Sequence, residues 1–339
     1  MKIALVTDAW HPQINGVVRA LSETARQAQQ IGHEVLVVNS LGQRTVPCPT
    51  YEEIRLTLRP YALVRRLLGE FQPDAVHIAT EGPLGLAARF YCKRRRWDFT
   101  TSFHTRFPEY LAARAPVPLD LSYAFLRWFH GGAVQTLVSN QALADEIRAR
   151  GITRLALWSR GVDTSLFRPL SESERRSVLD LPRPIFAYFG RVAVEKNVED
   201  FLRLELPGSK VVIGDGPQAA DLRSRYPRVH WLGMRQGEDL ARHLAATDVM
   251  VFPSRTDTLG LVILEANACG VPVAAYPVVG PLATVRSGIN GILDEDLGKA
   301  ARAALDLSRE TCRERAMVYD WASCTREFIA NLVPARGRH

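Results

Sequence analysis

The stretch DVMVFPSRTDTLGLVILEANACGVPVAA, residues 248–275, is the part of the sequence from which the fold is most readily inferred. Its two apolar runs, 248–252 and 271–275, have the length and composition of buried strands. Between them the pattern predicts a helix that opens at about Gly260 and ends on Gly270. Two strands joined through a helix form the repeating unit of a parallel sheet.

The same alternation extends along the chain in both directions. Strands are predicted at 2–7, 34–39, 74–79, 98–103, 134–138, 154–158, 184–190, 210–213 and 229–232, in addition to the two above. Helical patterns such as 17–31 lie between most of them. The segment 159–184 is rich in Pro, Ser and charge, which is typical of a linker, so we expect a domain boundary near 165–180. The predicted fold is α/β, with two doubly wound, Rossmann-like domains that face each other across a ligand-binding cleft.

Composition excludes several classes of protein. The 339 residues are 47% hydrophobic and 23% charged, as in ordinary globular proteins, and no apolar run is long enough to span a bilayer. The first residues lack the pattern of a signal peptide, so we expect a cytoplasmic protein. Five cysteines without a C-x-x-C pair favour free thiols over disulfides or a zinc site.

The net charge of +7 is concentrated in the first half of the chain. Residues 1–165 hold 20 basic and 14 acidic side chains, whereas residues 166–339 hold 23 and 22. A local basic excess indicates either a solvated surface or an anionic partner such as a membrane, a nucleic acid or a phosphorylated substrate. No nucleic-acid-binding motif is present, so nucleic acid is the partner we least expect.

The stretch 254–281 carries the densest chemical signal. An anion would meet the backbone N–H groups at the start of its helix, which belong to Thr258, Leu259, Gly260 and Leu261. Glu265 lies in an apolar run, where a buried carboxylate needs a hydroxyl or basic partner such as a ribose diol. The alternative is an ordinary helix with Asp257 as its N-cap and Glu265 facing solvent.

Two cations follow a predicted strand in FGRVAVEKNVEDF, residues 189–201. Arg191 and Lys196 are suited to hold a diphosphate, Arg through bidentate contacts and Lys as a point charge. The alternative is a solvated loop with a Glu195–Lys196 pair.

Two candidates lie in the first half of the chain. Gly16, in NGVVRAL (15–21), would leave room for a phosphate or sugar at a helix start, or it is simple turn chemistry. His104, in TSFHTRFPEY (101–110), follows a predicted strand, where it would hydrogen-bond a sugar hydroxyl, stabilise developing charge or serve only as a structural histidine.

Other motifs are weaker. Gly214, Gly216 and Ala219 have the G-x-G-x-x-A spacing of a dinucleotide site, although Pro217 equally suits the first position of a helix. Asp294 and Asp296 form a D-x-D that either holds a metal or, as we favour, caps a helix. Residues 93–96 (KRRR) either complement a helix C-terminus or contact an anionic surface.

Taken in order, the motifs NGVVRAL, FHTRFPEY, SRGVD, GRVAVEKN, GDGP and SRTDTLGLVILEANACGVPVAA resemble the family-4 retaining glycosyltransferases of GT-B fold. The resemblance covers nearly the whole chain and is strongest to bacterial enzymes that glycosylate membrane lipids such as diacylglycerol. It implies an acceptor-side domain at 1–165, a nucleotide-sugar domain at 166–315 and a final helix at 316–335 that returns to the first domain.

The resemblance also implies roles for individual residues. The donor diphosphate would be bound by Arg191 and Lys196, and the donor ribose by Glu265. The residues implied to approach the rest of the donor are Gly16, His104, Gly214, Met234, Arg235, Asp257, Thr258, Leu259, Gly260 and Leu261. Two departures stand out: Asp257 replaces the usual Glu, and Arg160 in SRGVD replaces the usual Asn.

The implied reaction transfers a glucose- or glucuronate-type hexose from a UDP-linked donor to a lipid hydroxyl, with retention and without a metal or other cofactor. The expected location is the inner face of the plasma membrane, because aromatic and basic residues interleave in 59–71 and 119–130. In the alternative, these two helices simply pack on the sheet. Three further alternatives are a GDP-mannose-dependent transferase acting on a lipid or polysaccharide, an NAD-dependent dehydrogenase and a non-catalytic sugar-nucleotide sensor. The sequence does not indicate an oligomeric state.

Overall fold

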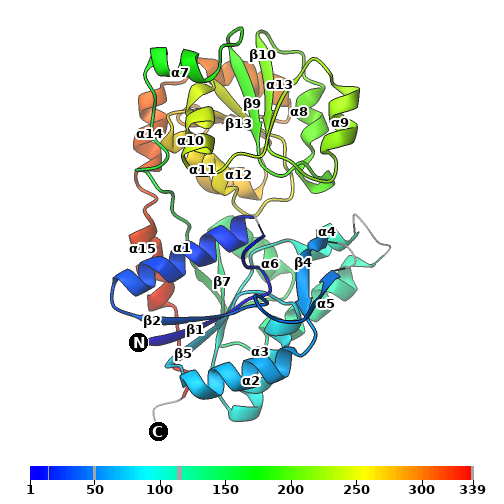
Figure 1. Cartoon of the computed structure of the whole chain (residues 1–339), viewed down its shortest axis with the longest axis vertical. Helices are drawn as coiled ribbons and strands as arrows, with labels where there is room; N and C mark the ends of the chain where they lie inside the picture. Colours follow the sequence, from blue (N-terminus) through cyan, green and yellow to red (C-terminus); the bar gives the residue numbers. More distant parts are fainter. Residues whose placement is uncertain (14, 49–50, 113–116, 337–339) are drawn as a thin grey trace. The chain divides into compact units, whose positions relative to one another are not determined.

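A computed structural model describes residues 1–13, 15–48, 51–112 and 117–336. The chain divides into two compact units (Figure 1). The first comprises Met1–Arg160 together with Trp321–His339, and the second comprises Gly161–Asp320. The division therefore falls five residues before the boundary predicted at 165/166 and five after the one predicted at 315/316.

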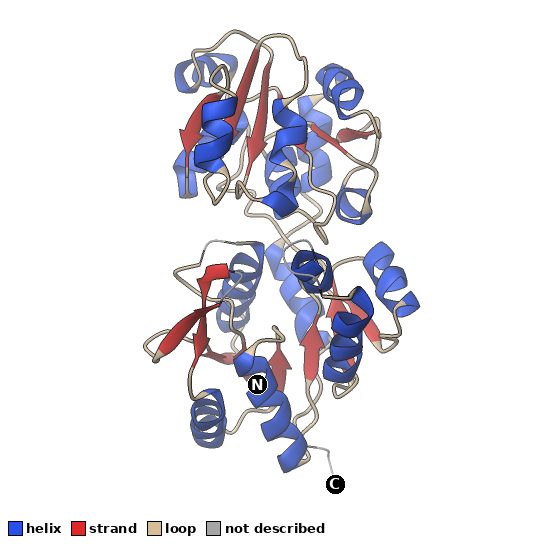
Figure 2. Ribbon diagram, turned by 90° about the vertical axis from the view of Figure 1, so that its right-hand side faces the viewer, coloured by secondary structure: helices blue, strands red, loops and turns tan. Residues whose placement is uncertain are grey.

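The first unit is built on a parallel sheet of six strands. Their order across the sheet is β2 (Glu34–Val38), β1 (Lys2–Val6), β5 (Ala75–Ile78), β6 (Thr100–Ser102), β7 (Gln135–Val138) and β8 (Leu155–Leu157). Helices lie on both faces of this sheet (Figure 2). They are α1 (Gly16–Gln30), α2 (Pro60–Phe71), α3 (Pro83–Arg95), α4 (Phe107–Ala112), α5 (Leu119–His130), α6 (Gln141–Ala149) and α15 (Trp321–Ala330).

The second unit repeats the plan with a strand order of its own. The order is β11 (His230–Gly233), β10 (Ser209–Ile213), β9 (Ile185–Phe189), β12 (Val249–Phe252), β13 (Val273–Ala275) and β14 (Gly291–Leu293), all parallel. Its helices are α7 (Glu172–Val178), α8 (Val198–Leu202), α9 (Ala219–Arg225), α10 (Gly237–Ala246), α11 (Leu261–Ala268), α12 (Val279–Thr284), α13 (Leu297–Ala303) and α14 (Arg309–Ala316), with single 3₁₀ turns at Val194–Lys196 and Ala304–Asp306. The predicted α/β class with two Rossmann-like domains is confirmed.

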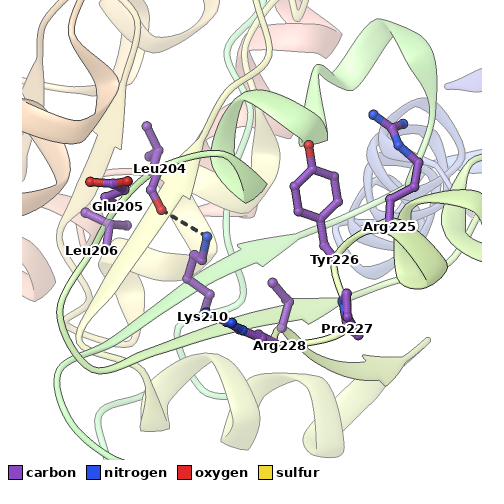
Figure 3. Close-up of a pocket in the computed structure, with 9 residues that line it drawn as sticks. Leu204, Glu205, Leu206, Lys210, Arg225, Tyr226, Pro227 and Arg228 are labelled. Atoms are coloured by element: carbon purple, nitrogen blue, oxygen red, sulfur yellow. Dashed lines mark hydrogen bonds between the residues drawn. The ribbon is translucent and has the colours of Figure 1, made fainter.

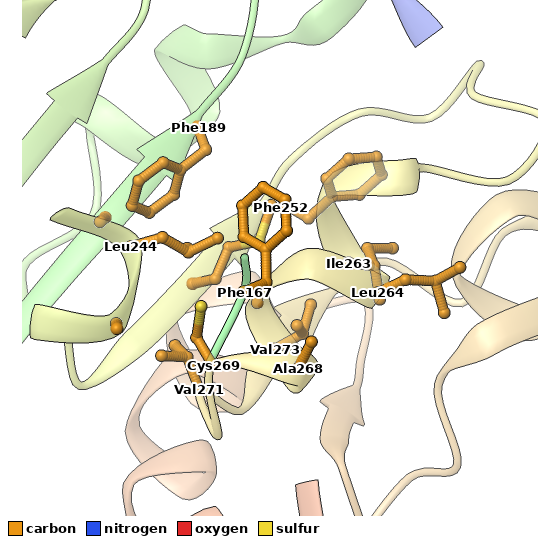
Figure 4. Packing of buried hydrophobic residues seen from close by; sticks show 14 of the residues in the cluster. Phe167, Phe189, Leu244, Phe252, Ile263, Leu264, Ala268, Cys269, Val271 and Val273 are labelled. Atoms are coloured by element: carbon orange, nitrogen blue, oxygen red, sulfur yellow. The ribbon is translucent and has the colours of Figure 1, made fainter. Parts of the chain in front are cut away.

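Each strand of the second sheet contributes side chains to two hydrophobic clusters, one on each face of the sheet. Along β9, Ile185, Ala187 and Phe189 enter the cluster in Figure 4, whereas Phe186 and Tyr188 enter the cluster on the opposite face. This alternation follows from the two-residue period of a strand. Because both faces are buried, the strand reads as a continuous apolar run, which is why the sequence revealed it.

Three features differ from the sequence interpretation. The segment 159–184 is packed rather than linker-like: Phe167 is fully buried in the second unit, and α7 within it begins with a capping box formed by Ser171 and Glu174. An antiparallel hairpin, β3 (Thr45–Cys48) and β4 (Tyr51–Thr57), and the short strand β14 were not predicted. They are short or polar, so their apolar periodicity is weak.

The last helix belongs to the first unit. On α15, Trp321 packs against Ala20 of α1, and Phe328 lies with its ring centroid 4.7 Å from that of Trp158. The Glu327 carboxylate accepts hydrogen bonds from the Ser159 backbone N–H (2.7 Å) and hydroxyl (2.6 Å). The expected return of the final helix to the first domain is confirmed.

A cluster of charges secures the start of the second unit. Asp248, just before β12, accepts hydrogen bonds from Arg175, from Arg183 Nη1 (2.8 Å) and from the Ile185 N–H (2.7 Å). Arg175 is buried. These contacts join the segment before β9 to β12.

Replacing Asp248 with Ala is expected to lower the free energy of unfolding by about 3 kcal/mol, because a buried guanidinium loses its counter-charge. Asp221→Ala is the matched control, since Asp221 pairs with Arg225 on an exposed helix face and its loss should cost less than about 0.5 kcal/mol. Chemical denaturation followed by circular dichroism measures both. Equal stability of the two variants would contradict the structural role of Asp248.

Candidate active site

The second sheet reverses its strand order between β9 and β12. The chain proceeds from β9 to β10 and β11 on one side, and β12 to β14 fill the other. At such a reversal, the loops that follow the two neighbouring strands diverge. Ligands of open α/β sheets bind between these loops, beyond the carboxyl ends of the strands. The loop after β9 contains Arg191 and Lys196, and the loop after β12 contains Asp257 and leads into α11. The two densest sequence motifs therefore meet at the reversal.

Hydrogen bonds tie these two loops together. The Thr256 hydroxyl donates to the Glu195 carbonyl at 3.0 Å, and the Ser254 hydroxyl reaches the same oxygen at 3.4 Å. Tyr188 donates to the Arg191 carbonyl at 2.6 Å. Gly280, in α12, supports the second loop closely enough that a Cβ there would lie 2.5 Å from the Asp257 carbonyl oxygen. The two loops are thus joined by hydrogen bonds from side-chain hydroxyls to backbone carbonyls.

Lys196 and Asp257 form an ion pair. Lys196 Nζ lies 2.5 Å from Asp257 Oδ1, and both side chains are mostly buried. The alternative in which Asp257 caps α11 is wrong, because Gly260 occupies the N-cap position with φ of 79° and makes no side-chain cap. The other alternative, a solvated loop, does not fit Glu195, which is buried. The remaining Asp257 oxygen, Oδ2, is buried and has no hydrogen-bond partner in the described part of the chain.

The start of α11 has the form that anion binding requires. The first N–H groups of an α-helix have no acceptor within the helix, and in α11 they begin with those of Gly260, the N-cap, and Leu261. Thr258 and Leu259 precede the cap, so their N–H groups belong to the loop and not to the helix. Gly260 adopts a left-handed conformation, and a Cβ on it would lie 2.9 Å from the Phe252 ring. Glu265 is only 4% exposed, so the alternative in which it faces solvent is wrong. A buried carboxylate thus stands one turn beyond an N-terminus suited to phosphate.

Gly214 and Gly216 are explained by loop packing. The Gly190 N–H donates to the Ile213 carbonyl (3.0 Å) and the Val192 N–H to the Asp215 carbonyl (2.9 Å). A Cβ at Gly214 would lie 1.8 Å from the Gly190 carbonyl oxygen, and one at Gly216 would lie 2.5 Å from that of Val192. The spacing therefore reflects contact between the loops after β9 and β10, which removes the feature that suggested a dinucleotide site. Pro217 does not open a helix, since α9 begins at Ala219.

The remaining predicted residues of this unit lie after β11. Met234 is half exposed, and Arg235 forms an ion pair with Asp239 at 3.0 Å. The Gly233 carbonyl accepts from the Gly214 N–H at 2.9 Å, so this turn joins the same row of loops at the carboxyl edge.

The carboxylates of the D-x-D, which follows β14, both have partners within the protein. Asp296 caps α13 by accepting from the Lys299 N–H, as favoured from the sequence, and Asp294 pairs with Lys299. Residues 93–95 close α3 and Arg96 is its C-cap, so their charges lie where they complement the helix dipole. A hollow of about 610 Å³ lies at the opposite, amino edge of the second sheet, near Lys210 and Tyr226 (Figure 3). Lys210 there is engaged with the carbonyls of Leu202 and Leu204, so it is not free to bind an anion.

In the first unit the strand order reverses between β1 and β5, and Asp8 bridges that point. Its Oδ1 accepts from the Leu84 N–H (3.0 Å), and its Oδ2 accepts from the Thr80 hydroxyl (2.9 Å) and the Gly85 N–H (3.4 Å). Asp8 thus serves the N-terminus of α3, whose N-cap is Gly82, with no side-chain cap. This contact could not be predicted from a local pattern, because the partners lie more than 70 positions away.

Gly16 and His104 both lie at the carboxyl edge of the first sheet. Gly16 is exposed at the start of α1, where the Asn15 side chain accepts from the Val17 and Val18 N–H groups at 3.0 Å. His104 follows β6, and both of its ring nitrogens have partners: Nε2 lies 2.8 Å from Ser102 Oγ and Nδ1 lies 3.2 Å from Arg160 Nη2. Burial and the neighbouring Arg160 charge hold the pKa of His104 well below its usual value.

Comparison with known families agrees along most of the chain. Residues 183–310 match the model described as glycosyl transferases group 1, and residues 14–166 match glycosyltransferase family 4. The chain is 31% identical to the sulfoquinovosyl transferase SQD2 of Arabidopsis thaliana, over 93% of this chain and 70% of that protein. It is 30% identical to a GDP-mannose-dependent alpha-mannosyltransferase of Corynebacterium glutamicum, over 92% of this chain and 82% of that protein.

Solved structures share the fold. Sucrose-phosphate synthase from Thermosynechococcus elongatus aligns with a TM-score of 0.77 at 19% identity, covering 97% of both chains. Anabaena HepE in complex with UDP-glucose aligns with a TM-score of 0.71 at 18% identity, covering 97% of this chain and 98% of that one. The predicted GT-B architecture is confirmed.

The Asp8 carboxyl gives the first unit a measurable pH dependence. Burial raises its pKa to about 6 in the folded protein, above the usual value of 3.8. The folded state holds this proton more tightly than the unfolded state. The contribution of Asp8 to the free energy of unfolding is therefore fully present below about pH 4 and is lost as the pH rises towards 6 and beyond. The loss is expected to be on the order of 3 kcal/mol relative to Asp8→Asn, which cannot ionise. Denaturation curves of both proteins between pH 4 and 7.5 test this, and parallel pH profiles would contradict it.

Proposed function

Since the chain belongs to the group 1 and family 4 glycosyltransferases, we propose that it transfers a glucose- or glucuronate-type hexose from a UDP-linked donor to a membrane lipid such as diacylglycerol. The proposal includes retention of the anomeric configuration and no requirement for a metal. The observation that carries it is the meeting of Arg191, Lys196 and the N-terminus of α11 at the strand-order reversal of the second sheet.

The donor diphosphate is assigned to that meeting point. A diphosphate carries the negative charge that two cations and a helix N-terminus attract. Glu265, buried one turn into α11, has the chemistry to accept hydrogen bonds from ribose hydroxyls. Met234 and Arg235, after β11, are assigned to the nucleobase. The structural neighbour HepE has been crystallised with UDP-glucose, which favours a UDP donor among the nucleotides.

Lys196 has to exchange partners when the donor arrives. It is paired with Asp257 in the structure, so a phosphate oxygen would share or replace that carboxylate. Asp257 is then available to accept from hydroxyls of the transferred sugar. We assign Asp257 to sugar binding rather than to nucleophilic attack, because the proposed reaction on one face of the sugar needs no carboxylate nucleophile.

The proposed reaction is driven by charge stabilisation. The bond between the anomeric carbon and the diphosphate oxygen breaks, and the negative charge that develops on the diphosphate is stabilised by Arg191, Lys196 and the α11 N–H groups. The acceptor hydroxyl forms the new bond on the same face, and its proton passes to the departing diphosphate oxygen. These proposed steps use neither a catalytic carboxylate nor a metal.

The donor assignment predicts the effect of removing the two cations. The double variant Arg191→Ala/Lys196→Ala is expected to lower the rate of sugar transfer at least about 100-fold, because each cation stabilises charge in the transition state. Lys299→Ala is the matched control, since Lys299 is exposed and pairs with Asp294, and it should keep near wild-type activity. Mass spectrometry of products formed from UDP-glucose and diacylglycerol measures both, with EDTA added to test the metal-free reaction. A double variant of near wild-type rate would refute the diphosphate assignment.

The membrane part of the proposal depends on the outer helices of the first unit. None of the helices in the described ranges is both long and apolar enough to cross a bilayer. On α2 the apolar residues pack inward, as Leu63 and Leu68 are buried, so this helix behaves as an ordinary covering helix. On α5, in contrast, Leu121 is 64% exposed and Trp128 is 53% exposed.

The exposed side of α5 continues onto α3. The Arg89 guanidinium of α3 lies 3.8 Å from the Trp128 ring centroid and donates to the Trp128 carbonyl at 2.9 Å. Phe90, beside it in sequence, is 58% exposed, and Lys93 and Arg94 follow on the same helix, also exposed. Apolar side chains bordered by cations suit an anionic bilayer, because the apolar side chains insert into it and the cations contact the lipid headgroups. The basic excess of residues 1–165 has the same sign.

Vesicle binding tests this surface. Leu121→Ser/Trp128→Ser is expected to weaken binding to vesicles of phosphatidylcholine with phosphatidylglycerol by about tenfold or more, because two apolar side chains no longer insert. Val318→Ser, a change at an equally exposed apolar residue of the second unit, should bind as the wild type does. Co-sedimentation measures the bound fraction. The membrane assignment fails if binding is indifferent to these changes and to the anionic lipid content.

A GDP-mannose donor remains the second candidate. It is favoured by the 30% identity to the Corynebacterium glutamicum mannosyltransferase. That match covers 82% of the mannosyltransferase, whereas the match to SQD2 covers 70% of SQD2. The product assay decides between the donors when UDP-glucose, UDP-glucuronate and GDP-mannose are supplied in parallel.

A further inference from the structure

A chain of hydrogen-bonded polar side chains, all buried except the half-buried His104, crosses the carboxyl edge of the first sheet. It runs from Arg160, after β8, to His104, Ser102 and then His77 of β5, whose Nε2 lies 3.0 Å from Ser102 Oγ. The far end is closed by His77 Nδ1, which lies 2.8 Å from Thr100 Oγ1. None of these contacts was foreseen from the sequence, where Arg160 stood out only as a replacement for Asn.

Arg160 determines the direction of every hydrogen bond in this chain. A guanidinium has donors only, so His104 Nδ1 has to accept. An accepting Nδ1 leaves the proton of the neutral imidazole on Nε2, which donates to Ser102 Oγ. The Ser102 hydroxyl then donates to its nearer acceptor, His77 Nε2 at 3.0 Å, rather than to the Ala79 carbonyl at 3.5 Å. His77 in turn carries its proton on Nδ1 and donates to Thr100.

Arg160 itself is held in place on three sides. Its Nη1 donates to the carbonyls of Trp158 (2.5 Å) and Ser159 (2.9 Å). Its guanidinium lies 3.8 Å from the Trp158 ring centroid. Although burial lowers its pKa to about 10, Arg160 stays charged at neutral pH. The chain therefore starts from a fixed positive group.

We propose that Arg160 is a positioning residue for sugar transfer, which acts by fixing His104 as a neutral imidazole with its proton on Nε2. This inference rests on the proposed function for its catalytic consequence, but not for the tautomer itself. An imidazolium at His104 would direct N–H groups at both Arg160 and Ser102, and the first of these contacts would set two donors against each other. Protonation would therefore move the ring out of place.

Several charged and titratable groups lie around His104. Arg160 faces its Nδ1, and His77 and His130 lie on the neighbouring β5 and α5. Glu81 lies 3.3 Å from His130 Nε2. Glu327 of α15 binds Ser159, next to Arg160. The charge in direct contact with the His104 ring is thus the positive one.

The test compares three forms of the full chain. Arg160→Lys keeps a group that only donates, whereas Arg160→Met removes the donor and keeps an unbranched apolar stem. Nitrogen-15 NMR of histidine-labelled protein, with His104→Asn used to assign the signal, reports the tautomer and titration of His104 without any substrate. The wild type and Arg160→Lys are expected to show a neutral ring with the proton on Nε2 from pH 5 to 8. In Arg160→Met, His104 is expected to titrate within that range.

The same variants have a kinetic readout. In Arg160→Met the transfer rate at pH 6 is expected to fall about fivefold or more relative to that at pH 8, whereas the wild type and Arg160→Lys should lack this acidic limb. A wild-type His104 that carries its proton on Nδ1, or that is charged at pH 7, would overturn the inference even if Arg160→Met does not fold. So would an Arg160→Met protein whose His104 keeps its tautomer and whose pH profile is unchanged. Should the chain prove not to transfer sugar, the NMR result still decides the tautomer.

Discussion

The reversal of strand order is the constraint on which both units depend. In a parallel sheet every strand delivers its following loop to the same edge, and only where the order reverses do two neighbouring loops diverge and leave room for a ligand. In the second unit that point lies between β9 and β12 and receives the Arg191 and Asp257 loops. In the first it lies between β1 and β5, where Asp8 binds Thr80 and the start of α3.

The two units treat charge at these edges differently. In the second, a cation is paired with a carboxylate, as Lys196 is with Asp257. In the first, burial lowers the pKa of His77 to about 3 and that of His104 well below its usual value, so both rings stay neutral. A site for a diphosphate requires retained charge, whereas a fixed network of hydrogen bonds requires that its histidines do not change state.

The sequence correctly predicted those elements whose pattern has a local cause. Buried strands such as β9 and β12 read as apolar runs, and Asp296 was correctly interpreted as a helix cap. The interpretation was wrong where tertiary packing overrides composition. Residues 159–184 have a linker's composition, yet Phe167 within them is a core residue of the second unit. Similarly, the G-x-G at Gly214 comes from contact between two loops rather than from a cofactor.

The sequence by itself determined the α/β class, the two-domain plan and the candidate donor residues, because apolar periodicity and short motifs are local properties of the chain. Only the tertiary structure decided which partners those residues have. The Lys196–Asp257 pair joins positions 61 apart, and the contact of Arg160 with His104 joins positions 56 apart. Such pairs form because the parallel strands of a sheet bring loops that are distant in the sequence to the same edge, and no local pattern records the order of the strands.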